Sequence, residues 1–243
     1  MNVIGVIPAR YSSSRFEGKV IADIMGKPMI QHVWERAKEA KTLDDVIIAC
    51  DDERIASVAR SFGAKAVLTA KGHACGSDRI IEIINPLDVK VVINIQADEP
   101  LIHPLMIDSL AQSLLGSPEI LMATLMKKIE DVSQIDDPNI VKVITDKNGF
   151  AMYFSRSAIP YRAKNSQVKE VFYYKHIGLY GYTKDFLFTY KNLPISRLEK
   201  IEQLEQLRVL EEGYKIKVIE TKYETIGVDT PEDLEKVKEY LRK

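Results

Sequence analysis

Short runs of β-branched residues alternate with segments of helical periodicity through the first half of the chain. The runs cover residues 3–7, 46–49, 66–69 and 91–95, and amphipathic segments separate them. Such alternation is typical of right-handed βαβ units around a mostly parallel sheet. We therefore predict a doubly wound α/β fold, whose ligands bind beyond the carboxyl ends of the strands.

Residue types at the expected helix ends agree with this interpretation. Pro28 suits the first position of a helix with an apolar stripe, and Gly63 suits the left-handed position after a helix over residues 53–62. Near the end of the chain, Thr230 and Asp233 predict a capping box around a helix that starts at Pro231.

The second half of the chain has a different pattern. Residues 141–161 predict two antiparallel strands joined at Lys147-Asn148-Gly149, and the polar stretch 162–170 predicts a loop. One long helix over residues 197–212 and a strand over 215–220 follow. Because no repeat or linker interrupts the chain, we expect a single domain over residues 1–243, with a smaller antiparallel subdomain inserted in the second half.

Composition excludes several classes of partner. The 34 Lys and Arg residues balance 35 Asp and Glu residues, so no overall field favours nucleic acid or an anionic membrane. The two cysteines lack CxxC spacing, and no apolar segment approaches the length that spans a bilayer. We expect a cytoplasmic protein that binds a small anion locally.

The loop PARYSSSRFEGK, residues 8–19, follows the first strand. It matches neither GxxxxGK[ST] nor GxGxxG, but it places Arg10, Arg15 and Lys19 around a turn at the ligand-binding edge. Cations of this kind hold the charges of a nucleoside triphosphate. Taken alone, a solvated basic loop is the simpler interpretation.

Acidic residues are expected at the same edge. The strand VVINI leads into Gln96, Asp98 and Glu99, and Asp229 precedes the last helix. Each acid alone could be a helix N-cap. Together with the basic loop, however, Asp98 and Asp229 predict a Mg²⁺ site, because this ion takes one or two carboxylates and completes its shell with phosphate and water.

A third polar segment, HACGSDR at residues 73–79, precedes an isoleucine-rich helix. Its position at a helix N-terminus favours anions. Cys75 lies within it, but no base is arranged beside it, so a nucleophilic role is not expected.

Eight ordered motifs give the chain a specific resemblance. They are IPARY-SSSR-x-x-GK, GKPMIQHVWERA, HxxGSDR, NIQADEP, VKVI with YFSRSAIPY, YKHIGLYGY, LEQLRVLE and GVDTPEDL. This set resembles the 3-deoxy-D-manno-octulosonate cytidylyltransferases, or CMP-KDO synthetases. The resemblance implies Mg²⁺-dependent attack by the anomeric hydroxyl of the acid sugar KDO on the α-phosphate of CTP. It also implies a homodimer that serves lipopolysaccharide biosynthesis, with residues 1–130 mainly binding nucleotide and 131–225 mainly binding sugar and dimerising.

The resemblance also assigns roles to individual residues. It implies that Arg10 and Lys19 grip the triphosphate with support from Arg15, and that Asp98 and Asp229 bind the metal. The nucleoside contacts are the backbone at Ala9 and the side chains of Ser77 and Arg79. The implied sugar site consists of Gln96, Arg156, His176, Tyr180, Glu205 and Gln206, with Arg156 as partner of the substrate carboxylate.

Simpler interpretations and departures from the family accompany these roles. Considered alone, His176 is a packed histidine, and Glu205 and Gln206 belong to a solvated helix face. The chain has Phe16-Glu17 where Leu-Pro is common, Ala97 in place of a glycine, and Ser77-Asp78 in place of a frequent Gly-Thr or Ser-Thr. These departures affect substrate detail and remove no expected ligand.

Other functions stay open at this point. The same chemistry on 8-amino-KDO or another ulosonic acid is the nearest alternative. A non-catalytic nucleotide-sugar sensor on the same fold is the second. A redox enzyme is weaker, because the dinucleotide fingerprint is missing.

Overall fold

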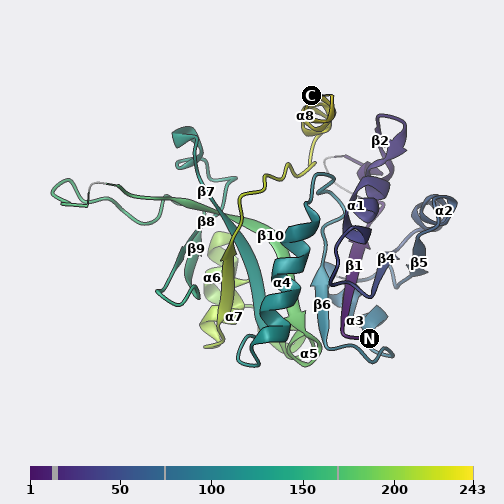
Figure 1. The fold of residues 1–243 in the computed structure, drawn as a ribbon, viewed down its shortest axis with the longest axis horizontal. Helices are drawn as coiled ribbons and strands as arrows, with labels where there is room; N and C mark the ends of the chain where they lie inside the picture. Colours follow the sequence, from purple (N-terminus) through teal and green to yellow (C-terminus); the bar gives the residue numbers. More distant parts are fainter. Residues whose placement is uncertain (13–15, 74, 169, 243) are drawn as a thin grey trace.

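The computed structural model describes residues 1–12, 16–73, 75–168 and 170–242, and its centre is a twisted sheet (Figure 1). The sheet has nine strands, of which seven form the path β11-β7-β10-β6-β1-β4-β5, with β8 and β9 attached beside β10. These strands are β1 (Val3–Ala9), β4 (Asp45–Cys50), β5 (Lys65–Leu68), β6 (Val91–Asn94), β7 (Met122–Lys128), β8 (Lys142–Thr145), β9 (Ala151–Ser155), β10 (Tyr174–Thr183) and β11 (Ile216–Glu220).

Strand directions divide the sheet into two parts. Strands β6, β1, β4 and β5 are parallel to their neighbours in this group. The long strand β10 runs antiparallel to β6, β7 and β8, and β8 runs antiparallel to β9. The predicted α/β fold with a smaller antiparallel part is therefore confirmed, and a separate small hairpin joins β2 (Asp23–Ile24) to β3 (Lys27–Pro28).

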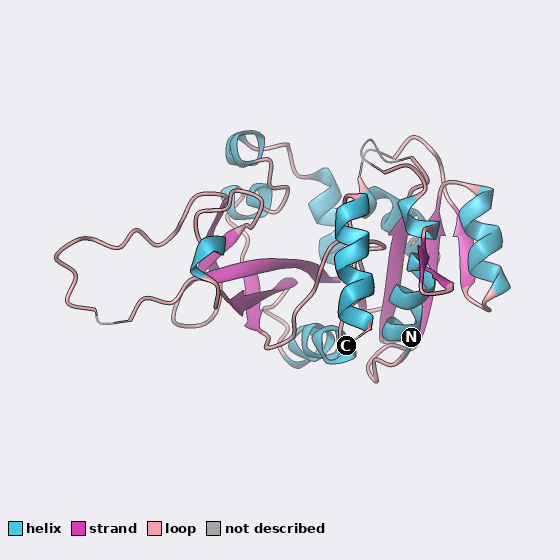
Figure 2. Cartoon of the chain, turned by 90° about the horizontal axis from the view of Figure 1, so that it is seen from above, coloured by secondary structure: helices cyan, strands magenta, loops and turns pink. Residues whose placement is uncertain are grey.

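Helices cover both faces of the sheet (Figure 2). They are α1 (Met29–Lys38), α2 (Glu53–Ser61), α3 (Gly76–Ile84), α4 (Pro104–Gly116), α5 (Lys184–Asn192), α6 (Arg197–Glu202), α7 (Leu207–Glu211) and α8 (Pro231–Leu241), with 3₁₀ turns at Lys19–Ile21 and Val132–Gln134. Alternate residues of β1 enter different cores: Val3 and Ile7 join one, while Ile4 and Val6 join the other. A strand buried on both faces is the physical basis of the doubly wound arrangement.

Most local predictions hold. The capping box at Thr230 and Asp233 is present, and Gly63 adopts φ of +83° after α2. Gly149 turns the chain between β8 and β9 with φ of +74°. Pro28 is the N-cap of α1, one position before the expected one.

The predicted long helix over residues 197–212 is wrong. The chain forms α6 and α7 instead, separated at Gln203, which adopts the left-handed conformation with φ of 54°. The Arg156 guanidinium donates to the carbonyls of Glu202 at 2.8 Å and Gln203 at 3.5 Å. Arg156 therefore donates to carbonyl oxygens that would accept from backbone N–H groups if the helix continued.

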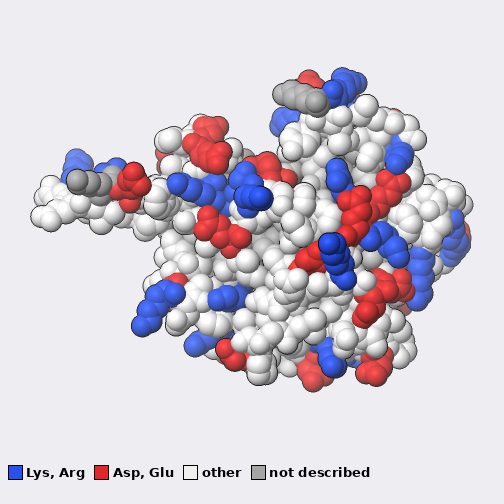
Figure 3. Space-filling view, in the orientation of Figure 1, with Lys and Arg blue, Asp and Glu red and all other residues white. Residues whose placement is uncertain are grey.

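The surface and the helices agree with the balanced composition. Figure 3 shows basic and acidic side chains interleaved over one face of the molecule. Among the described residues, no helix combines the length and apolar character needed to cross a membrane. A long loop between β9 and β10 extends away from the body (Figures 1 and 2).

Candidate active site

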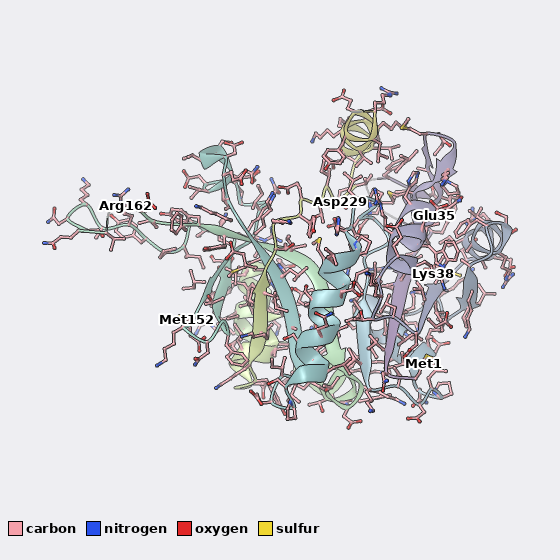
Figure 4. The ribbon with its side chains drawn as sticks, in the orientation of Figure 1. Met1, Glu35, Lys38, Met152, Arg162 and Asp229 are labelled. Carbon is pink, nitrogen blue, oxygen red and sulfur yellow. The ribbon has the colours of Figure 1, made fainter. Side chains whose placement is uncertain are left out.

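Three segments far apart in the sequence meet at the carboxyl ends of β1 and β6. The first is the loop after β1, the second is the turn after β6, and the third is the chain that leads from β11 to α8. Asp229, at the end of the third segment, lies at the upper end of the sheet in Figure 4. This is the edge at which open α/β sheets bind ligands.

Lys19 joins these three segments. Its Nζ donates to Asp98 Oδ2 at 2.7 Å, to Asp229 Oδ1 at 3.0 Å and to the carbonyl oxygen of Val228 at 3.0 Å. Burial lowers the pKa of Lys19, but the carboxylates of Asp98 and Asp229 outweigh it and the net shift is upward. The ammonium is therefore firmly charged.

The same oxygens fit a small hard cation. Two carboxylates and one carbonyl already surround a positive charge, so their mutual repulsion is offset only while a cation lies between them. No group of three or more His, Cys, Asp or Glu that could hold a metal occurs in the described parts of the chain. Mg²⁺ needs no such group, because it binds one or two carboxylates together with phosphate oxygens and water.

The simpler interpretation of these two acids as N-caps is wrong. The N-cap of α4, the first helix after Asp98, is His103, whose Nδ1 accepts from the N–H of Leu105. The N-cap of α8 is Thr230, not Asp229. Neither Asp98 nor Asp229 caps these helices, and both instead bind Lys19.

The loop after β1 closes around Tyr11. The Tyr11 N–H donates to Asp51 Oδ1 at 3.0 Å, and its carbonyl accepts from the N–H of Gly18 at 2.9 Å. Gly18 has φ of +68°, and a Cβ there would lie 3.3 Å from the Tyr11 ring, so glycine suits this position. Arg10 is exposed at the start of the loop, and Arg15 lies outside the described residues.

Beside this loop lies a pocket of about 280 Å³. It is lined by Pro8, Arg10, Cys75, Gly76, Ser77, Asn94, Gln96, Tyr180, Tyr182, Tyr190, Glu205 and Gln206. An adjoining pocket of about 590 Å³ shares Cys75, Ser77, Tyr190 and Glu205 with it. The structure thus brings together six predicted residues: Arg10, Ser77, Gln96, Tyr180, Glu205 and Gln206. Ala9 ends β1 immediately before Arg10, with its side chain buried.

Two polar atoms of this pocket need a partner. Glu205 Oε1 and Gln206 Nε2 are buried, and neither makes a hydrogen bond within the described structure. Leaving such atoms unpaired costs about 1–3 kcal/mol each. Polar atoms buried at a pocket wall indicate a ligand with hydroxyl or carbonyl groups, so the solvated-face interpretation of these two residues is wrong.

Among the side chains predicted to contact the nucleoside and the sugar, three line neither pocket. Arg79 is 1% exposed, and its guanidinium donates to Asp51 Oδ2 at 3.2 Å and to the Thr69 hydroxyl. The Arg156 guanidinium donates to the carbonyls of Pro138, Glu202 and Gln203. Both arginines therefore support the loops around the site in this structure.

His176 is the third of these residues. It lies behind Tyr180, with the two ring centroids 5.4 Å apart, and its Nε2 hydrogen-bonds the Thr124 hydroxyl at 2.9 Å. Burial lowers the pKa of His176 to about 3, which keeps the ring neutral. The packed-histidine interpretation describes this structure.

Sequence reasoning missed several pocket residues. Asn94 and Tyr182 lie on β6 and β10, and Tyr190 lies on α5. The alternation of Tyr180 and Tyr182 was a usable signal, because residues two apart on a strand share a face. Nothing local marked Tyr190, which reaches the pocket only through the packing of α5.

Cys75 and Glu99 complete the surroundings. Burial raises the pKa of the Cys75 thiol, which agrees with the expectation that it is not a nucleophile. Burial and the neighbouring Asp98 raise the pKa of Glu99 to about 7, and its Oε2 makes no hydrogen bond within the described structure.

Comparison with known proteins gives consistent matches over the whole chain. The cytidylyltransferase family model matches residues 4–218. A 3-deoxy-manno-octulosonate cytidylyltransferase of Solibacter usitatus is 52% identical over 97% of this chain and 92% of its own length. The same-named protein of Geotalea uraniireducens is 49% identical, with 100% of both chains covered.

Solved structures extend this likeness to three dimensions. A CMP:2-keto-3-deoxy-manno-octonic acid synthetase complexed with CTP superposes with a TM-score of 0.93 at 41% identity, covering 100% of this chain and 99% of that chain. A glucose-1-phosphate thymidylyltransferase of Bacillus anthracis, described as putative, shares the fold with a TM-score of 0.69 at 18% identity, covering 99% of this chain and 96% of that chain. From the family match and the full-length relatives together, this chain belongs to the cytidylyltransferase family.

Proposed function

We propose that this chain transfers the cytidylyl group of CTP to KDO and releases pyrophosphate. The observation that carries the proposal is the convergence of Asp98 and Asp229 on Lys19 beside a pocket with unpaired polar atoms at Glu205 and Gln206. The first group of residues suits a triphosphate that carries a metal ion, and the second suits a polyhydroxylated sugar. The names of the full-length relatives and the CTP complex of the similar structure support the same reaction.

The basic residues of the β1 loop bind the triphosphate in this proposal. Arg10 is exposed at the pocket and Lys19 is charged, so both neutralise the phosphates and the departing pyrophosphate. Arg15 supports them. In this proposal, Ser77 at the start of α3 and the backbone at Ala9 contact the nucleoside.

The metal site is a proposal too. Asp98 and Asp229 would hold Mg²⁺, which when bound supplies charge neutralisation at the α-phosphate and lowers the pKa of the attacking hydroxyl. Lys19 keeps the two carboxylates together before substrates arrive. The remaining work of the chain is positioning for in-line attack.

The sugar is held in the 280 Å³ pocket in this proposal. Gln96, Tyr180, Glu205 and Gln206 bind its hydroxyl and carboxylate oxygens directly. His176 supports Tyr180 from behind. Arg156 holds the bend that presents Glu205 and Gln206, and it reaches the substrate carboxylate only if its guanidinium leaves the carbonyls it now binds.

Pyrophosphate release measured over a matrix of nucleotides and sugars tests this function. The expected result is rapid release with CTP, KDO and Mg²⁺ together, and slow release when UTP replaces CTP or when either substrate is omitted. Faster turnover with 8-amino-KDO at limiting concentration would identify that sugar as the substrate. Thermal stabilisation by CTP without pyrophosphate release from any sugar would favour the sensor.

Assembly and location complete the proposal. We propose a homodimer that acts in the cytoplasm, where two unpaired cysteines are stable. Within residues 172–190, where the sequence predicts exposed apolar side chains for the interface, Tyr182, Phe186 and Tyr190 are buried but Phe172 is exposed. The extended loop also exposes Tyr161 and Val168, and a second copy would cover them together with Phe172. Light scattering after size-exclusion chromatography tests the dimer, and a monomeric mass contradicts it.

A further inference from the structure

The segment over residues 221–229, here called the strap, carries Asp229 to the site. It leaves β11, crosses the sheet and enters α8 (Figure 1). Backbone hydrogen bonds hold its two ends: the Thr221 N–H donates to the Met126 carbonyl at 2.8 Å, and the Val228 N–H donates to the Asp98 carbonyl at 2.9 Å. Between these ends the strap has no regular secondary structure, so side chains must fix its path.

Glu224 lies at the middle of the strap and contacts two lysines of the sheet. Its Oε2 accepts from Lys127 Nζ at 2.7 Å, and its Oε1 accepts from Lys175 Nζ. Lys127 and Lys175 are directly opposite each other on β7 and β10. Like charges in that position destabilise a sheet, and here the carboxylate of Glu224 lies between them.

Burial makes this arrangement stronger than an ordinary surface ion pair. The side chains of Lys127 and Lys175 are 14% and 16% exposed, and that of Glu224 is 38% exposed. An exposed pair contributes at most about 1 kcal/mol, whereas buried charges are costly when a partner is removed. Removing the charge of Glu224 would leave two largely buried lysine side chains with their ammonium groups facing each other.

The next residues of the strap connect Glu224 to the site. Thr225 lies beside Glu99, the residue after Asp98, and both side chains line one small cavity. Gly227 also lies against Glu99, since a Cβ at this glycine would be in ordinary van der Waals contact with Glu99 Oε1 at 3.4 Å, and the next residue, Val228, donates its N–H to the Asp98 carbonyl. The position of the strap therefore sets the separation between Asp229 and Asp98.

We propose that Glu224 is a positioning residue, which through Lys127 and Lys175 fixes the strap so that Asp229 stays beside Asp98. This inference rests on the proposed function for the role of the two aspartates. Lys175 precedes His176 on β10, so the same contacts connect the strand behind the sugar pocket to the segment that carries Asp229.

The test compares Glu224→Gln with Glu220→Gln in the full-length chain. Glu220 is exposed at the end of β11 and makes no ion pair within the described residues, so it is the matched control. Lys127→Met is a second variant, which keeps one of the two contacts of Glu224. The probe is Mn²⁺, whose binding is measured by electron paramagnetic resonance in the presence of CTP and without sugar. Hydrogen exchange across residues 221–229 is measured in parallel.

We expect Glu224→Gln to weaken Mn²⁺ binding about tenfold, as outer contacts of metal ligands do, and to speed amide exchange within the strap. Lys127→Met shifts both in the same direction by less, and Glu220→Gln changes neither. In turnover, the metal concentration for half-maximal rate rises while the KM for the sugar keeps its wild-type value.

Unchanged Mn²⁺ affinity and unchanged exchange in Glu224→Gln would overturn the inference. A wrong proposed function would give a different result, because the unmodified protein with CTP would then bind no Mn²⁺. In that case accelerated exchange at Val228 and Asp229 in Glu224→Gln supports the strap contact, and normal exchange overturns it.

Discussion

The parallel and antiparallel parts of the sheet build their shares of the site in different ways. In the parallel part, Arg10 and Asp98 follow directly from the ends of β1 and β6, so the topology alone delivers them to one edge. In the antiparallel part, Glu205 and Gln206 depend on a bend at Gln203, which Arg156 maintains from the segment after β9 through its hydrogen bonds to Glu202. The carboxyl ends of neighbouring parallel strands lie at one edge of the sheet because of the topology, whereas a bend between two short helices is stabilised by contacts with other parts of the fold.

The largest expected effect comes from disrupting the carboxylate pair that binds Lys19 at the edge of the parallel part. Asp98→Asn or Asp229→Asn removes half of the carboxylate pair, and turnover should fall about 10²–10³-fold, the scale of losing one preorganised electrostatic group. The fold should persist, because Lys19 keeps one carboxylate partner. Pyrophosphate release and thermal melting measure the two effects, with the exposed Asp88→Asn as control. A near wild-type rate would remove the residue from the mechanism.

The second effect is a pH dependence of stability in the antiparallel part. His176 has a pKa near 3 in the folded chain, against about 6.5 unfolded. As the pH falls, His176 is therefore protonated in the unfolded chain before it is protonated in the folded chain. The free energy that neutral His176 contributes to folding is lost as the pH falls from about 6.5 toward 3. Each pKa unit is worth about 1.4 kcal/mol, so the loss amounts to several kcal/mol.

Urea unfolding of the chain and of His176→Asn across this pH range measures that loss. The variant should show a shallower decline in unfolding free energy between pH 6.5 and the lowest pH at which the chain stays folded. Parallel curves for the two proteins would show that His176 does not cause the decline.

A smaller effect separates the two parts directly. Arg156→Lys keeps the charge but cannot donate in the planar arrangement that reaches the carbonyls of Pro138, Glu202 and Gln203. We expect the KM for the sugar to rise about tenfold, the scale of losing a supporting contact, with little change in the KM for CTP. Steady-state kinetics with each substrate varied in turn measure both constants. Equal changes in the KM for the sugar and the KM for CTP would contradict the assignment of Arg156 to the sugar-binding part of the site.

The smallest effect concerns the bend itself. Gln203→Gly relieves a left-handed conformation that costs an ordinary residue roughly 1–2 kcal/mol, but glycine adds about 0.5–1 kcal/mol of chain entropy to the unfolded state. The net expectation is a gain of a few tenths to about 1 kcal/mol with turnover unchanged. Thermal melting and pyrophosphate release check the two parts, and a lower melting temperature would contradict the expected relief of strain.

The sequence by itself determined the parallel part of the fold and its ligand edge. β-branched runs, caps such as Thr230 and glycines such as Gly63 act over a few residues, so their effects can be recognised locally. Motif order also identified half of the residues that line the 280 Å³ pocket, including Gln96 and Glu205.

Only the tertiary structure decided the rest. It split the predicted helix at Gln203, engaged Arg79 and Arg156 in hydrogen bonds outside the two pocket linings, and brought Tyr190 to the pocket wall. The physical reason is the distance along the chain. The Arg156 guanidinium binds carbonyls of a segment about 46 residues later, and Lys19 binds acids from two separate segments, so these contacts form only when the whole chain folds.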